Sequence, residues 1–212
     1  MKEWLQKKFP HGYNYFVAQQ DAEQINQYMS RRLFLPTYDR SKQSLWGESA
    51  RNLSAMGSKI GWVPNKLLAA FLAETVEMEI AEACAASEGL LQSKKKHVDY
   101  ARELLAQLNL LQVAQKNPYT LSEGEVKLLW FITQWVKQPE YLIIGHLPSS
   151  LSIRRTHELL DFIWTSINNS KINKTIILGY VVCQKHWFSE FLKITNEKLT
   201  NKFRVYENFT FK

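Results

Sequence analysis

The last third of the chain combines two short apolar runs with an amphipathic segment between them. Residues 141–144 (YLII) and 175–178 (TIIL) are runs typical of strands that are buried on both faces of a sheet. Residues 154–167 carry apolar side chains at the spacing of a helix. Strand, helix and strand in this order form a βαβ unit, which predicts a parallel sheet with a right-handed crossover.

Two more strands and a helix are predicted nearer the N-terminus. Residues 13–17 (YNYFV) and 60–63 (IGWV) are short runs of strand-forming side chains, and Pro64 closes the second run. Residues 21–33 place their apolar side chains on one helical stripe, and Pro36 follows them. We expect these elements to belong to the same α/β lobe as the βαβ unit.

The middle of the chain is predicted to form three helices. The first spans residues 75–87 with Thr75 as its N-cap, the second begins near Ser93, and the third spans residues 123–137. Gly89 ends the first of them. On that helix apolar side chains are expected to face inward and glutamates outward: Val76, Ile80, Ala83 and Cys84 against Glu77, Glu79 and Glu82.

No repeat, Pro-rich linker or low-complexity segment divides the chain. Residues 1–212 are therefore expected to form one α/β domain with two lobes. Residues 1–63 and 139–212 are assigned to an α/β core lobe, and residues 64–138 to an inserted helical subdomain. Hydrophobic residues make up 45% of the chain, which excludes a wholly disordered protein.

No apolar run approaches the length of a membrane span, and the charged N-terminus lacks the apolar segment of a secretory signal. Cys84 and Cys183 lie far apart, and the five histidines show no metal-ligand spacing. Neither a disulfide framework nor a metal site is therefore expected. These features predict a cytoplasmic protein with no transmembrane segment of its own.

The chain is basic, with 27 Lys and Arg residues against 20 Asp and Glu residues and a net charge of +7. This excess favours phosphates, nucleic acids or anionic lipid surfaces as partners. Part of it lies in the run Lys94-Lys95-Lys96 and part in a Lys- and Asn-rich C-terminal tail. The run is interpreted either as a solvated face or as a contact for nucleic acid.

Four segments, in their order and spacing, resemble the nucleotide-binding domain of an ATP-binding-cassette (ABC) transporter, closest to the ATPases of energy-coupling-factor and cobalt-type importers. Residues 117–125 (NPYTLSEGE) resemble the (H/N)-P-x-x-LSGGQ signature, and residues 141–152 follow at the distance of the Walker B strand and D-loop. Residues 60–80 are similar to the Q-loop region, and residues 175–178 to the strand before the switch histidine.

The resemblance implies a P-loop NTPase-like parallel sheet core flanked by helices, with an ABC-type helical subdomain inserted. It covers residues 58–182 well and the first 57 residues poorly. The N-terminal antiparallel sheet of the family is therefore expected to be reduced or absent.

The segment at the position of the family's phosphate loop lacks the chemistry of a phosphate site. Such a loop needs glycines, a lysine and a Ser or Thr for magnesium. The corresponding residues have none of these, and they bring two carboxylates that repel phosphate: Ala18, Gln19, Gln20, Asp21, Ala22 and Glu23. No bound nucleotide is expected. ATP and Mg²⁺ would be expected as cofactors only if this assignment of the phosphate loop is wrong.

The other catalytic positions of the family are also replaced. By resemblance, the magnesium-binding Asp of Walker B falls on Gly145 and the general base on His146. The D-loop Asp falls on Ser152, the Q-loop Gln on Asn65, and the switch His on Val181. No catalytic residue is therefore expected in this chain.

The signature is the best-kept motif: Leu121, Ser122, Glu123, Gly124 and Glu125. In the family its Ser hydroxyl and Gly amides reach the partner's γ-phosphate across a dimer. Ser122 and Gly124 are kept, whereas Glu123 replaces the first Gly and Glu125 replaces the Gln. The alternative interpretation is a helix start capped by Ser122, and both remain open.

A groove beside the Q-loop receives a coupling helix of the membrane subunit in such importers. By resemblance it comprises Asn65, Phe71, Leu72, Glu74 and Glu77, whose apolar and acidic side chains would suit an amphipathic basic helix. The alternative is that the apolar members pack within the lobe itself.

These observations predict a degenerate, non-hydrolytic ABC-ATPase-like subunit that pairs with an active ATPase or with a transporter's membrane subunit. It would be cytoplasmic, or peripheral on the inner face of the cell membrane. One alternative is a nucleic-acid-binding module that uses Lys94, Lys95, Lys96 and the basic tail. Another is a divergent but active ABC ATPase that uses ATP and Mg²⁺.

Overall fold

A computed structural model describes residues 14–18, 60–63, 71–145, 151–169, 175–180 and 203–206. The chain divides into two compact units. The sheet unit comprises residues 1–64, 139–147 and 173–212, and the helical unit comprises residues 65–138 and 148–172. The helix predicted over residues 21–33 and the reduction of an N-terminal antiparallel sheet concern residues outside the described ranges.

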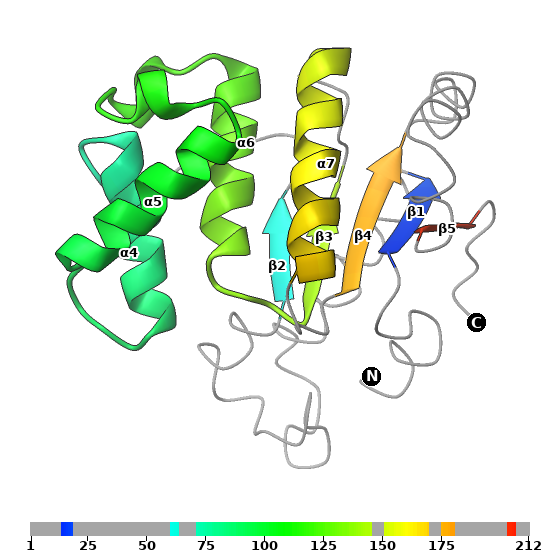
Figure 1. Cartoon of the computed structure of the whole chain (residues 1–212), viewed down its shortest axis with the longest axis horizontal. Coiled ribbons are helices and arrows are strands. Elements are labelled where there is room, and N and C mark those ends of the chain that lie inside the picture. Colours follow the sequence, from blue (N-terminus) through cyan, green and yellow to red (C-terminus); the bar gives the residue numbers. More distant parts are fainter. Residues whose placement is uncertain are drawn as a thin grey trace, which may run out of the picture. The chain divides into compact units, whose positions relative to one another are not determined.

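The described residues of the sheet unit form one sheet of five parallel strands (Figure 1). Their order is β2-β3-β4-β1-β5, so β4 lies between β3 and β1. The predicted parallel sheet is therefore confirmed, and its predicted strands lie within one or two residues of the observed ones. The strands are β1 (Asn14–Ala18), β2 (Ile60–Val63), β3 (Tyr141–Ile144), β4 (Thr175–Tyr180) and β5 (Phe203–Tyr206).

Strand β3 is buried along its whole length. Each of its four residues is at most 2% exposed, because β2 and β4 flank it and apolar side chains occupy both of its faces. Ile60 pairs with Tyr141 on one side, and Thr175 pairs with Tyr141 on the other. The continuous apolar run in the sequence correctly predicts this position.

Strand β5 is an element that the sequence interpretation misses. It pairs in parallel with β1, with Asn14 opposite Phe203 and Val17 opposite Tyr206. The Lys- and Asn-rich composition of the surrounding tail hides it. The strand-forming side chains of Phe203, Val205 and Tyr206 are the signal that would have revealed it.

The described residues of the helical unit form four α-helices: α4 (Val76–Ser87), α5 (Lys95–Gln107), α6 (Glu123–Trp135) and α7 (Ile153–Asn169). Two short 3-10 helices, η1 (Leu111–Val113) and η2 (Pro118–Thr120), connect α5 to α6. Thr75 is the N-cap of α4, as predicted, and its Oγ1 accepts a hydrogen bond from the Met78 amide at 3.3 Å. Gly89 follows α4 with a φ of 74°, the left-handed conformation that ends a helix. Within the described ranges, no helix has the length and apolar character needed to cross a bilayer.

The core of this unit joins α4, α5 and α6 through aliphatic side chains and α6 to α7 through aromatic ones. The ring of Phe162 on α7 lies 6.0 Å from that of Phe131 and 5.3 Å from that of Trp135. Ile80, Leu105 and Leu129 are completely buried at 0% exposure. Residues 148–172, which the sequence assigns to the sheet lobe, group with these helices.

Glu77 corrects the prediction that the glutamates of α4 face outward. It is only 5% exposed, and its carboxylate accepts hydrogen bonds from Arg102 Nε at 2.8 Å and Nη2 at 3.1 Å. This two-point contact ties α4 to α5 and, with Gln115, holds the pKa of the Glu77 carboxyl below its usual range. Helical periodicity cannot distinguish a solvated Glu from one that is buried against an Arg.

Replacing the Glu77 carboxylate by the neutral amide in Glu77→Gln should lower the melting temperature at pH 7 by roughly 3–8 °C. The exposed Glu74→Gln should leave it unchanged and is the matched control. The pKa of Glu77 is lowered in the folded state, so its stabilisation is present above its ordinary pKa of 4.5 and is lost as the pH falls below that. The gap between wild type and Glu77→Gln should therefore close in acid. An equal shift in both variants would contradict a specific role for the ion pair.

Candidate functional site

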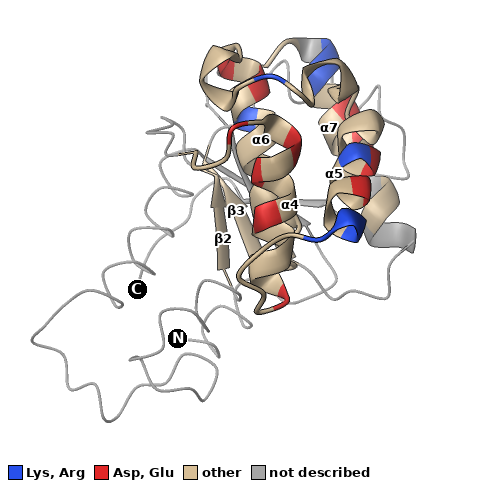
Figure 2. Ribbon diagram, turned by 90° about the vertical axis from the view of Figure 1, so that its left-hand side faces the viewer, with Lys and Arg blue, Asp and Glu red and all other residues tan. Residues whose placement is uncertain are grey.

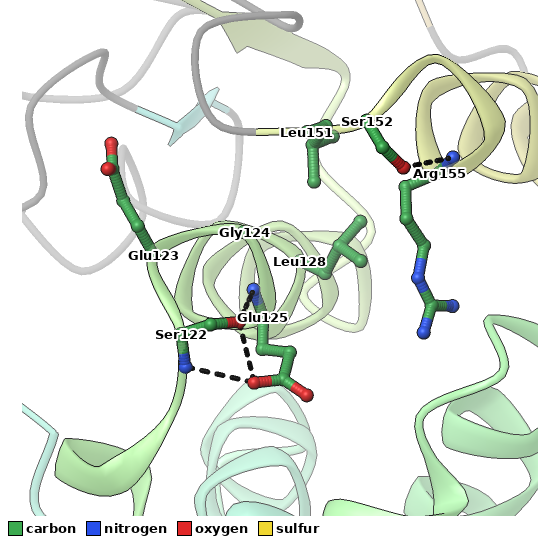
Figure 3. A pocket seen from close by; sticks show the side chains of 8 residues that line it. All are labelled: Ser122, Glu123, Gly124, Glu125, Leu128, Leu151, Ser152 and Arg155. Carbon is green, nitrogen blue, oxygen red and sulfur yellow. Dashed lines mark hydrogen bonds between the residues drawn. The ribbon is translucent and has the colours of Figure 1, made fainter.

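A hollow of about 420 Å³ lies where α6 and α7 begin. It brings the signature-like segment together with the D-loop position, two motifs that are far apart in the sequence (Figure 3). The residues that line it are Ser122, Glu123, Gly124, Glu125, Leu128, Leu151, Ser152 and Arg155.

Ser122 and Glu125 form a closed set of hydrogen bonds at the start of α6 (Figure 3). The Ser122 amide donates to Glu125 Oε2 at 2.9 Å, and the Ser122 hydroxyl donates to the same oxygen at 2.7 Å. The Glu125 amide in turn donates to Ser122 Oγ at 3.4 Å. This is a capping box, and the hydrogen bonds from Ser122 hold the pKa of the Glu125 carboxyl below its usual range.

The capping box gives the signature-like segment a role within its own chain. The Ser122 hydroxyl is already engaged with Glu125, so the group that contacts phosphate in the family is occupied here. The Glu123 side chain is exposed and extends away from the Glu125 carboxylate (Figure 3). Two carboxylates thus occupy the positive end of α6, where an added anion would be repelled. The structure supports the interpretation as a capped helix start.

The D-loop position, Ser152, is exposed and precedes α7. Its Oγ accepts a hydrogen bond from the Arg155 amide at 3.3 Å. Ser152 therefore begins a helix in the same way as Ser122, and its neutral hydroxyl is directed to its own backbone.

Arg155 is a residue of this hollow that the sequence interpretation does not single out. Its guanidinium donates to the carbonyl oxygens of Leu108 at 2.9 Å and Asn109 at 3.2 Å, and to the Glu158 carboxylate at 3.0 Å. It thereby satisfies carbonyls at the end of α5 and ties α7 to that helix. The close spacing of Arg154, Arg155 and Glu158 is the only local signal of these contacts.

Of the positions matched to ATP chemistry, Gly145 is the best described. It is buried, and its amide donates to the Val63 carbonyl at 2.8 Å, which continues the pairing of β3 with β2. Ala18 ends β1. The other matched positions lie outside the described residues: Gln19, Gln20, Asp21, Ala22, Glu23, Asn65, His146 and Val181.

The residues predicted to form a partner groove separate into buried and exposed members. Phe71 is 5% exposed and contacts the rings of Tyr119 and Trp130, so it packs within the helical unit. Leu72 is 95% exposed, and Glu74 is exposed as well. Glu77 is wrong as a surface contact, because it is buried against Arg102.

The structure also brings together three potential metal ligands that sequence spacing does not reveal. The ligand atoms of Cys84, Glu88 and His97 lie within 4.8 Å of one another. However, the Lys94 amide donates to His97 Nδ1 at 2.9 Å, so the ring proton resides on Nε2. Lys96 Nζ forms an ion pair with the Glu88 carboxylate at 2.6 Å. The site therefore offers a cation the N–H of His97 and a carboxylate that is already neutralised, and neither group suits a cation.

Removing the cap in Ser122→Ala should destabilise the protein by about 1 kcal/mol, because the first turn of α6 loses its hydroxyl partner. Ser122→Asn, which retains a capping side chain, should restore most of this loss. The measurement is the denaturant midpoint of each variant. If the alanine variant were as stable as wild type, the capping interpretation of this motif would fail.

No family model and no curated protein matches the sequence. Solved structures do match the fold, and one is cbiO1 from Clostridium perfringens, part of the ABC transporter complex cbiONQ. It aligns with a TM-score of 0.56 and 13% identity over 81% of this chain and 68% of its own. A dimeric ATP-binding cassette in a post-hydrolysis state bound to ADP and Pi aligns with a TM-score of 0.59 and 11% identity, over 79% of this chain and 74% of its own. An ATP-binding subunit of an ABC transporter aligns with a TM-score of 0.58 and 15% identity, over 84% of this chain and 72% of its own.

The chain therefore has the P-loop NTPase-like α/β fold of ABC ATPase domains.

Proposed function

We propose that this protein is a non-hydrolytic ABC-ATPase-like subunit that pairs with an active ATPase or with the membrane subunit of a transporter. The fold is that of ABC ATPase domains. The observation that carries the proposal is the self-contained capping box at the signature-like segment. A motif that contacts phosphate in the family has become an internal helix cap with two carboxylates.

The positions for ATP hydrolysis support the same conclusion. A hydrolytic site needs a magnesium ligand at the end of the Walker B strand, and the residue matched to it is Gly145, which has no side chain to offer. The segment matched to the phosphate loop has no Gly, Lys, Ser or Thr. These losses are independent of one another, so restoring one of them would not restore a nucleotide site.

The exposed part of the partner groove supports a role in assembly. Leu72 is almost fully exposed. The backbone carbonyl of the preceding residue, Phe71, accepts a hydrogen bond from the hydroxyl of Tyr119, a residue that is 64% exposed. Glu74 adds negative charge beside this apolar surface. An amphipathic helix with basic residues would match both properties. The solved neighbour cbiO1 is itself part of a transporter complex.

Isothermal titration of the full chain with ATP, with and without Mg²⁺, should give no saturable heat at about 100 μM protein, a concentration suited to weak binding. The physical reason is that no cationic loop neutralises the triphosphate. The accompanying assay of ATP turnover should show no Mg²⁺-dependent rate above the buffer. Saturable binding or turnover would contradict the proposal and favour a divergent active ATPase.

Charge reversal at the exposed groove should weaken pairing with a transporter. Tagged full-length protein is purified from solubilised membranes of its native cells, and ABC transporter subunits are quantified by mass spectrometry. Glu74→Lys should lower their recovery at least about fivefold, the scale of one lost charge contact. Glu103→Lys, an exposed reversal on α5, is the matched control. Equal recovery for both variants would contradict the role of the groove. If the wild-type protein recovered no transporter subunit, the proposed pairing itself would be wrong.

A further inference from the structure

A second cavity, of about 460 Å³, lies in the helical unit where α4 ends and α5 begins. It is distinct from the signature-like hollow and shares no residue with it. Its polar lining includes Ser87, Glu88, Lys96, His97, Tyr100 and Lys137. Basic side chains gather where α5 begins (Figure 2).

His97 is a buried polar residue in the lining of this cavity. Its side chain is 2% exposed. Its Nδ1 accepts a hydrogen bond from the Lys94 amide at 2.9 Å, so the proton of the neutral ring lies on Nε2. Glu88 Oε2 lies 3.3 Å from Nε2, and this contact lacks the geometry of a full hydrogen bond. A buried N–H in a folded protein normally has a well-placed acceptor. The cavity therefore contains an incompletely satisfied donor, which could donate a hydrogen bond to the oxygen of an anion.

Two lysines supply positive charge around this donor. Lys96 Nζ contacts Glu88 Oε2 at 2.6 Å, so one carboxylate oxygen faces both Lys96 and His97. Lys137 also lines the cavity, and its burial lowers the pKa of its ammonium group because the charged form is poorly solvated. An anion next to Lys137 would offset that desolvation. With two lysines and one glutamate, the cavity carries an excess of one positive charge.

The geometry points to this cavity as a binding site for the phosphate group of a small organic molecule, in which the Glu88 carboxylate occupies the position of the anion until the ligand displaces it. A phosphate monoester carries nearly two negative charges and three acceptor oxygens. Lys96, Lys137 and the His97 Nε2–H are donors that match them. Glu88 is exposed and follows the last residue of α4, so it can turn to solvent.

The size and walls of the cavity favour an organic phosphate over the bare ion. Its volume lies within the range of small-molecule sites, about 300–1,000 Å³. Tyr100 and Val136 give it an aromatic and an apolar surface beside the charged groups. Binding at this cavity is independent of the pairing proposed above, because no residue of the partner groove contributes to it.

The test is titration of the full chain with inorganic phosphate and with phenyl phosphate at constant ionic strength, by calorimetry and by the ¹⁵N signal of His97. Both probes should bind, and phenyl phosphate should bind more tightly through Tyr100 and Val136. Lys96→Ala and Lys137→Ala should each weaken binding about tenfold, the scale of one charge-assisted hydrogen bond. Lys95→Ala, which removes an exposed neighbouring charge outside the cavity, is the matched control and should change nothing.

The direction in which Glu88→Gln changes the phosphate affinity is the decisive result. Removing the competing carboxylate should tighten phosphate binding severalfold, whereas a merely structural Glu88 would leave it unchanged or weaken it. Equal losses in Lys95→Ala and Lys96→Ala would show nonspecific attraction to a basic surface and overturn the proposal. Zinc binding that Glu88→Gln abolishes, with no phosphate binding, would overturn it in favour of a cation site at Cys84, Glu88 and His97.

Discussion

The reciprocal hydrogen bonds between Ser122 and Glu125 determine where α6 begins, and the packing of the helical unit depends on that point. From this start, the buried face of α6 presents Leu128, Leu129, Phe131 and Ile132 to the core, and its last turn places Trp135 against Phe162 of α7. The cap therefore has a structural role that is independent of any nucleotide.

The same cap also shows that a serine at a helix start can serve either of two tasks. A serine that begins a helix is equally suited to capping its own backbone or to contacting a phosphate, because both tasks use orphan donors at the positive end of the helix. The residue three positions later decides between them. Glu125 supplies an internal anion, so an external one is no longer needed to satisfy the Ser122 donors. The Ser122 donors are thus satisfied within the chain itself.

Charged side chains connect the helices in a similar way. Glu77 joins α4 to α5 through an ion pair with Arg102, and Arg155 joins α7 to the end of α5 through hydrogen bonds to backbone carbonyls. Both contacts span long separations in sequence, and the lower dielectric of partly buried sites strengthens them. The Glu88 carboxylate departs from this pattern, since one of its oxygens faces both an ammonium group and a histidine donor that it does not satisfy. That imbalance distinguishes a cavity with unused binding capacity from the satisfied contacts elsewhere in the unit.

Local sequence determined the strands β2 and β3, the caps at Thr75 and Ser122, and the parallel order of the βαβ unit, because apolar periodicity and capping chemistry act over a few residues. It missed β5, whose short run lies in a polar tail and is recognisable only beside β1. It also placed Glu77 outward and overlooked Arg155 and the His97 cavity. The partners of the last three lie 9 to 47 residues away along the chain, as in Glu88–His97 and Leu108–Arg155, and β5 pairs with a strand near the other end of the chain. Burial and hydrogen bonding between distant residues exist only after the helices have packed, so the tertiary structure alone decided them.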